Sequence, residues 1–114
     1  MMRVFSTLAV QGLLQELAPS LAEEAGVEIV FLFEPTTLLL QRLRAGEPAD
    51  VAILTVDGIE ALTREGRLQA GTRTDVAISE VGVAVRTGAP KPDISTEGAV
   101  RTLLREAASL CYSK

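Results

Sequence analysis

The sequence predicts an α/β fold, a three-layer lobe with a mainly parallel sheet. Three observations support this prediction. Short apolar runs alternate with amphipathic segments, and the connections between them are short. Val, Leu and Ala are frequent, whereas aromatic residues make up only 4% of the chain, as in sheets covered by helices on both faces. The 114 residues are enough for one domain with a sizeable core.

The first strand is expected over residues 3–5, with an amphipathic helix after it. Pro19 interrupts the helical pattern, since proline is tolerated only in the first turn of a helix. We therefore expect a break near Ala18 and a second helical piece that reaches Ala25. Gly26 is a natural left-handed stop.

Residues 27–33 form a continuous apolar run, which predicts a second strand that is buried on both faces. Pro35 and Thr36 are expected to open the second helix. Arg42 and Arg44 complement its C-terminal end, and Gly46 ends it.

A third strand and its exit turn are expected over residues 50–55. Asp57 followed three residues later by Glu60 has the pattern of a capping box, so a third helix is expected to begin there. Gly66 ends that helix.

The C-terminal part is expected to continue the pattern. Residues 80–86 place three valines on one side and small residues on the other, so another backbone is expected to approach closely there. Ser95 is expected to cap a further amphipathic helix, and one more strand is expected to begin at Leu110. Cys111 is expected to be a small buried apolar residue.

Charge and composition exclude several function classes. The net charge is −4 and no basic stripe is present, so we expect no nucleic-acid binding. No apolar run reaches the roughly 18 residues of a membrane span, and polar residues interrupt the first twelve residues too early for a secretion signal. The sequence has no histidine, one cysteine and no carboxylate cluster with metal-site spacing, so neither a metal nor another cofactor is expected. Because no nucleophile–base pair is visible, we expect that the chain is not an enzyme.

Hydroxyl residues follow two of the expected strands at the point where a helix begins. Ser6 and Thr7 follow the first strand, and Thr36 and Thr37 follow the second. A helix start exposes backbone N–H groups and the positive end of the helix dipole, and hydroxyl donors beside it favour a bound anion. Serine and threonine are also ordinary helix caps, so the residues alone leave both interpretations open.

Three stretches resemble the solute-binding proteins of molybdate-type ABC transporters: FEPTTLLLQRLRAGEPADVAILT, VGVAVRTGAPKPDIST and the ending SLCYSK. The resemblance implies a type II periplasmic binding protein fold, with two α/β lobes around a cleft. It assigns residues 1–86 to the first lobe, 87–92 to a crossover linker and 93–114 to the beginning of the second lobe. The chain has about half the length that two lobes need, so it is expected to be truncated before most of the second lobe.

The resemblance also implies a ligand and a set of ligand-binding residues. The ligand is a small oxyanion such as molybdate, tungstate or sulfate, which offers only hydrogen-bond acceptors and is suited by neutral donors. The implied ligand-binding residues are Ser6, Thr7, Thr36, Thr37, Thr55 and Tyr112. Thr55 can instead simply cap the third helix, and the Tyr112 ring can belong to the core.

The resemblance implies a transporter permease as a partner. The last expected helix has an apolar face that must be buried although most of the second lobe is missing, so we also expect a second copy of the chain as a partner, in a dimer with exchanged C-terminal segments. The resemblance implies a periplasmic location, and the missing leader leaves a cytoplasmic one open. An alternative function is the effector-sensing domain of a transcription regulator with the same fold.

Overall fold

β1 (Met2–Ser6) is the middle strand of a three-stranded sheet in the computed structural model, which describes residues 1–112. It pairs in parallel with β2 (Ile29–Phe33) on one side and with β3 (Val51–Ile53) on the other, in the order β2-β1-β3. The predicted α/β class and parallel sheet are confirmed.

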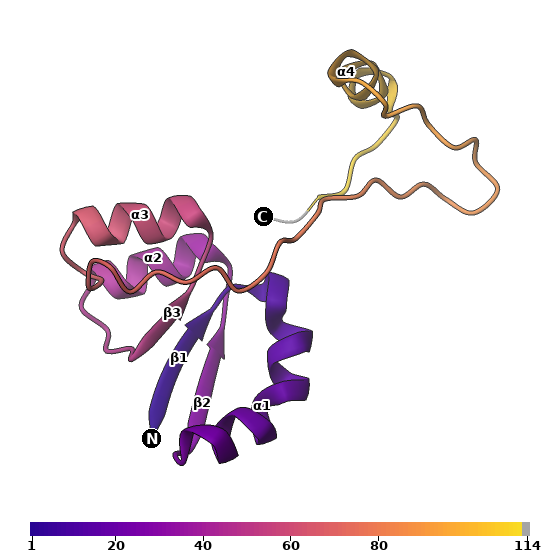
Figure 1. Ribbon diagram of the computed structural model, residues 1–114. Coiled ribbons are helices and arrows are strands. Elements are labelled where there is room, and N and C mark those ends of the chain that lie inside the picture. The colour runs from indigo at the N-terminus through magenta and orange to yellow at the C-terminus, as the bar shows by residue number, and fades with distance from the viewer. Residues whose placement is uncertain (113–114) are drawn as a thin grey trace. The chain divides into compact units, whose positions relative to one another are not determined.

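The helices of the chain follow the strands in sequence. They are a short 3₁₀ helix η1 (Leu8–Val10), and the α-helices α1 (Gln11–Ala25), α2 (Thr36–Arg44), α3 (Val56–Arg64) and α4 (Glu97–Glu106). The chain divides into two units, Met1–Ser79 and Glu80–Lys114. The first unit holds the sheet with η1, α1, α2 and α3, and the second holds α4 (Figure 1).

The core of the first unit lies on the side of the sheet that faces α2 and α3. Phe5 of the middle strand packs there with Leu39, Leu43 and Leu62, and three of these four side chains are almost completely buried. Apolar residues of β2, β3 and the loops surround this cluster. Helices therefore cover the sheet on this face, while α1 lies on the other (Figure 1).

The face toward α1 is less completely filled. A hollow of about 380 Å³ lies between α1 and the strands. Val4, Phe31 and Val51 line it from the sheet, and Leu14 and Leu21 line it from the helix. Leu14 is the buried residue of α1, so this helix contributes little to the core.

The predicted break at Pro19 is wrong, because α1 runs continuously through it to Ala25. Both Pro19 and Gln15, whose carbonyl loses its i+4 hydrogen-bond donor, are exposed. Water can therefore satisfy that carbonyl, which makes an interior proline tolerable. Gly26 ends the helix in the left-handed conformation at φ 66°, as predicted.

The second strand is shorter and less buried than predicted. It begins at Ile29 instead of residue 27, and Val30 is 41% exposed. The expectation of burial on both faces is wrong because β2 is an edge strand of the described sheet, with a hollow under one face.

The second unit departs most from the expectations. Residues 80–86 form no strand, and a Cβ built on Gly82 would meet no atom within 4 Å, so no backbone approaches there. No strand begins at Leu110, and Cys111 is exposed instead of buried. The implied segment 93–114 includes residues 113–114, which lie outside the described residues.

The cap of α4 is Thr96 and not Ser95. The Thr96 hydroxyl accepts a hydrogen bond from the Ala99 N–H at 3.1 Å. Ser95 is engaged elsewhere, since its N–H and hydroxyl both donate to the Asp93 carboxylate, at 2.9 and 2.6 Å. These two hydrogen bonds lower the pKa of Asp93 below its ordinary value.

Candidate functional site

The three parallel strands end level with one another. Ser6, the last residue of β1, pairs with Phe33 and Ile53, the last residues of its neighbours. Hydrogen bonds continue past the strand ends, since the Thr7 N–H donates to the Ile53 carbonyl at 2.9 Å and the Glu34 N–H donates to the Ser6 carbonyl at 3.2 Å. The turns that carry the predicted ligand residues of the first unit therefore leave the sheet at one edge.

Ser6 is the most buried of the predicted ligand residues, with no exposed surface. Its hydroxyl donates to the carbonyl of Thr7 at 3.0 Å. A hydroxyl has a single hydrogen, so this donor is committed to the turn in the present conformation. Ser6 would contact an anion as a donor only after its side chain rotates.

Thr7 follows Ser6 as the N-cap residue of η1, and its side chain makes no capping hydrogen bond. It is half-buried at the edge of the sheet. The Thr7 side chain therefore does not cap the helix, although the residue occupies the N-cap position. Thr7 directly follows the end of β1.

α2 begins without a side-chain cap. Its N-cap residue is Pro35, and the carbonyl of this proline accepts the N–H groups of Leu38 and Leu39 at 3.0 and 3.2 Å. The N–H groups of Thr36 and Thr37 have no hydrogen-bond partner among residues 1–112. The first turn contains no acidic residue, whereas Arg42 and Arg44 lie in the last turn as predicted. The N-terminal end of α2 thus combines two unpartnered amides, two hydroxyls and the positive end of the helix dipole.

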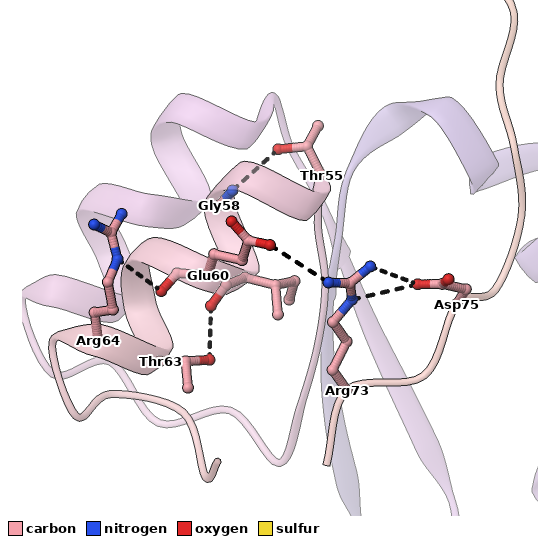
Figure 2. Close-up of polar contacts among 8 residues, drawn as sticks. Thr55, Gly58, Glu60, Thr63, Arg64, Arg73 and Asp75 are labelled. Carbon is pink, nitrogen blue, oxygen red and sulfur yellow. Dashed lines mark hydrogen bonds and ion pairs between the residues drawn. The ribbon is translucent and has the colours of Figure 1, made fainter. Parts of the chain in front are cut away.

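α3 begins differently, as Figure 2 shows. Thr55 is the N-cap residue and its hydroxyl oxygen accepts the Gly58 N–H at 3.4 Å. The predicted capping box is wrong. Asp57 lies inside the first turn and is not the N-cap residue. Glu60 forms an ion pair with Arg73 at 3.5 Å, and Arg73 also contacts Asp75 (Figure 2).

Gly58 allows the first turn of α3 to lie close to α2 and to its own N-cap residue. A Cβ built on Gly58 would lie 3.3 Å from the Thr55 hydroxyl and 3.5 Å from a methyl group of Leu40. The first turn of α3 is thus pressed against α2 and against its own cap. Capped and carrying the Asp57 carboxylate, this helix start favours an anion less than that of α2.

Tyr112 is the predicted ligand residue of the second unit, and it is exposed and outside any strand. Its ring therefore does not belong to a core within that unit. The structure thus brings five predicted residues to one sheet edge, namely Ser6, Thr7, Thr36, Thr37 and Thr55.

A network of ion pairs connects the segment before α2 with the last turn of this helix and the loop after it, and the sequence patterns did not identify it. Arg42 binds both carboxylate oxygens of Glu34, with Nε and Nη2 each at 2.7 Å. Its Nη1 donates to Glu47 at 2.9 Å, and Glu47 also lies 3.6 Å from Arg3. The hydrogen bonds from Arg42 lower the pKa of Glu34, and those from Glu34 and Glu47 raise the pKa of Arg42. Glu34 and Arg42 are eight residues apart, a spacing that matches no helical pair, so no sequence signal indicates the contact.

Two further features are absent from the described residues, namely a metal-binding cluster and a helix able to span a membrane. Residues 1–112 contain no group of three His, Cys, Asp or Glu side chains that could hold a metal ion. Within the same range, no helix has the length and apolar character needed to cross a membrane.

Comparison with known proteins identifies the family. A model of the bacterial extracellular solute-binding proteins matches residues 2–113, nearly the whole chain. The chain belongs to this family. The resemblance to solute-binding proteins is thereby confirmed, and its molybdate-type detail stays a prediction.

A protein from a Pseudomonas species that is similar in sequence to this chain is named aconitate isomerase. It is 33% identical over 115 residues, which cover 96% of this chain and 44% of the relative. The chain thus spans less than half the length of this relative. The expectation that the chain is not an enzyme is contradicted, because the relative that matches 96% of this chain is named as an isomerase. The expectation weighed only the side chains in 114 residues, and the relative has other groups outside the matched part.

Proposed function

We propose that residues 1–79 provide part of a binding site for a small oxyanion, located at the carboxyl ends of the three strands. The observation that carries the proposal is the start of α2, where the Thr36 and Thr37 amides have no partner among residues 1–112 and no side chain caps the helix. Membership in a solute-binding family supports a ligand at this position.

The donors at this edge suit an anion that offers only acceptors. Amides and threonine hydroxyls stabilise the negative charge of the ligand by hydrogen bonds, so the site needs no buried cation. Such a cation would cost several kcal/mol in desolvation if it were left unpaired. Thr36 is the first residue of α2 but does not cap it, and Thr7 makes no capping hydrogen bond. Helix capping therefore does not explain either hydroxyl. Ser6, Thr37 and Thr55 complete the proposed set within residues 1–79. Tyr112 belongs to the second unit, and its role as a ligand residue stays a separate prediction from the resemblance.

Two classes of oxyanion share this chemistry. Molybdate, tungstate and sulfate are the inorganic class that the sequence resemblance implies. The carboxylates of aconitate are the organic class, and the name of the Pseudomonas relative supports them. Membership in the family of extracellular solute-binding proteins supports, for either class, a proposed role beside an ABC transporter permease in the periplasm.

Calorimetric titration of the chain with sulfate, molybdate, tungstate and aconitate tests the proposal and separates the classes. Thr36→Val keeps the shape of the side chain and removes the hydroxyl donor. We expect a loss of about 1–3 kcal/mol of binding free energy, roughly 5- to 150-fold in affinity, because a buried acceptor loses its partner. Thr63→Val is the matched control, since the Thr63 hydroxyl donates to the Ile59 carbonyl inside α3.

Absence of binding to all four anions, or preference for a neutral or cationic solute, would contradict the proposed site. Equal affinities of Thr36→Val and the parent chain would remove Thr36 from it.

The similarity to an isomerase favours a second candidate function, catalysis on aconitate. Incubating the chain with aconitate and following its signals by proton NMR distinguishes the two functions. Conversion to an isomer supports the enzyme, whereas saturable binding without conversion supports a solute-binding role.

We also propose that the chain self-associates, as a symmetric dimer with exchanged C-terminal segments. α4 is amphipathic, none of its residues is buried, and Leu104 is half exposed. Apolar faces of this kind favour association. Sedimentation at micromolar concentration should show a dimer that Leu104→Glu weakens and that Thr102→Glu, a change at another exposed position of α4, leaves intact. A monomer would contradict this proposal.

A further inference from the structure

The Glu34 carboxylate is the acidic group closest in sequence to the start of α2. It lies two residues before Thr36, and its N–H is fixed to the Ser6 carbonyl at 3.2 Å. Its side chain is 21% exposed, so it is largely withdrawn from solvent. A carboxylate so near an uncapped helix start is attracted to the same N–H groups and dipole that would attract a ligand.

Arg42 binds this carboxylate away from the N-terminal end of α2. It belongs to the last turn of α2, six residues beyond Thr36, which corresponds to about 9 Å along the helix axis. Both of its hydrogen bonds to Glu34 are 2.7 Å long, and the two-point geometry fixes direction as well as distance. Glu34 is therefore drawn toward the C-terminal half of α2.

We propose that Arg42 is a positioning residue for anion binding: by holding the Glu34 carboxylate, it keeps the N-terminal amides of α2 available to the ligand. This inference rests on the proposed function and names a specificity device for the same site. Without Arg42, Glu34 becomes a competing internal anion.

The neighbouring charges support a specific pairing of Arg42 with Glu34. Arg42 also donates to Glu47, which faces Arg3 of β1, and the Arg3 N–H donates to Asp50 at 2.7 Å. Glu47 thus has a second cation and Asp50 a backbone donor, whereas the Glu34 carboxylate has only Arg42 as an ion-pair partner among the described residues. Loss of Arg42 consequently releases Glu34 in particular.

The chain contains a matched control for this test. Arg44 lies on the same last turn of α2 and makes the same two-point contact, but with Glu65, the residue after α3. Arg42→Met and Arg44→Met each remove one such two-point ion pair and keep an unbranched side chain. Arg42→Met also removes the contact with Glu47, which keeps Arg3 as a partner. Only the first releases a carboxylate next to the start of α2.

The first experiment measures affinity for sulfate and for aconitate by calorimetry. We expect Arg42→Met to weaken binding on the order of tenfold, the effect of one nearby like charge partly screened by solvent. Arg44→Met should bind as the parent chain does. The double variant Glu34→Gln/Arg42→Met should recover most of the affinity, because the released group is then neutral. Unchanged binding by Arg42→Met, or no recovery in the double variant, would overturn the proposal.

The second experiment needs no ligand and separates failure of this inference from failure of the proposed function. The amide signals of Thr36 and Thr37 are followed by NMR while carboxylates titrate, between about pH 3 and 7. In Arg42→Met these signals should move with one carboxylate titration that is missing in the double variant and that lies at lower pH in the parent chain, where Arg42 lowers the pKa of Glu34. No such movement would overturn the positioning role, even if anions bind. Movement without any anion binding to the parent chain would support the release of Glu34 and reject the anion site.

Discussion

Arg44 and Glu65 join the C-terminal ends of α2 and α3 through two parallel hydrogen bonds. Nε lies 2.9 Å from one carboxylate oxygen of Glu65, and Nη2 lies 2.7 Å from the other. A second contact between the two helices lies at Gly58, near the start of α3, which is close to Leu40 of α2. The two helices are thus in contact at their C-terminal ends and between the start of α3 and the middle of α2.

Acid should weaken this junction. The hydrogen bonds from Arg44 are the main reason that the pKa of Glu65 is lowered. A carboxylate whose folded pKa lies below its unfolded one stabilises the fold above the unfolded pKa, and this contribution is lost as pH falls through the folded pKa. Glu65→Gln should therefore reduce the acid dependence of the denaturation midpoint. Glu16→Gln, a change at an exposed residue of α1, should leave it unaltered. Equal acid slopes in all three chains would contradict the prediction.

Two adjacent leucines of α2 should differ sharply in their contribution to stability. Leu39 has no exposed surface and belongs to the core, whereas Leu38 is 45% exposed. Leu39→Ala should cost about 2–5 kcal/mol of unfolding free energy through lost burial and a cavity. Leu38→Ala should cost less than about 1 kcal/mol. Denaturant unfolding followed by circular dichroism measures both, and similar losses would contradict the assigned face of α2.

The close packing at Gly58 predicts a large effect of added side-chain volume. Gly58→Val should destabilise the protein by roughly 1–3 kcal/mol, since Thr55 and Leu40 would have to move. Gly12→Ala is the control: a Cβ at Gly12 would meet nothing within 4 Å, and alanine favours a helix by up to about 1 kcal/mol. A neutral Gly58→Val would show that α2 and α3 are packed less closely.

Pro19 should cost the first helix stability. It lies inside α1 on an exposed surface, and it withholds the hydrogen bond that the Gln15 carbonyl would receive. Pro19→Ala should raise the unfolding free energy, by up to about 3 kcal/mol. Helix content and the denaturation midpoint should increase together. A lower midpoint would indicate that the stiffness of proline in the unfolded chain matters more than the missing hydrogen bond.

Much of the first unit could be predicted from apolar periodicity and glycine stops. The three strands and the helices after β2 and β3 lie near their predicted places, since each depends on local patterns that tertiary contacts reinforce. The cap positions were harder to predict. Thr55 and Asp57, or Ser95 and Thr96, are all good caps by residue type, and the choice depends on contacts such as the one at Gly58.

The candidate site was predictable only in outline. Parallel strands bring their carboxyl ends to one edge, so the convergence of Thr7, Thr36 and Thr55 followed from the fold class. Which hydroxyl is already engaged did not follow. The Ser6 hydrogen bond to the Thr7 carbonyl and the long-range pairing of Glu34 with Arg42 depend on side-chain geometry that no spacing rule contains.

The middle position of β1 has a consequence for the growing polypeptide. Both strands that flank β1 follow it in the chain, and Arg3 meets Asp50 at a separation of 47 residues. At about 5–20 residues per second, the ribosome needs roughly 2–9 s to make that intervening stretch. Val4 and Phe5 lack their β3 partners, Val51 and Ala52, during this interval, so one edge of β1 is open to a chaperone until β3 has been made.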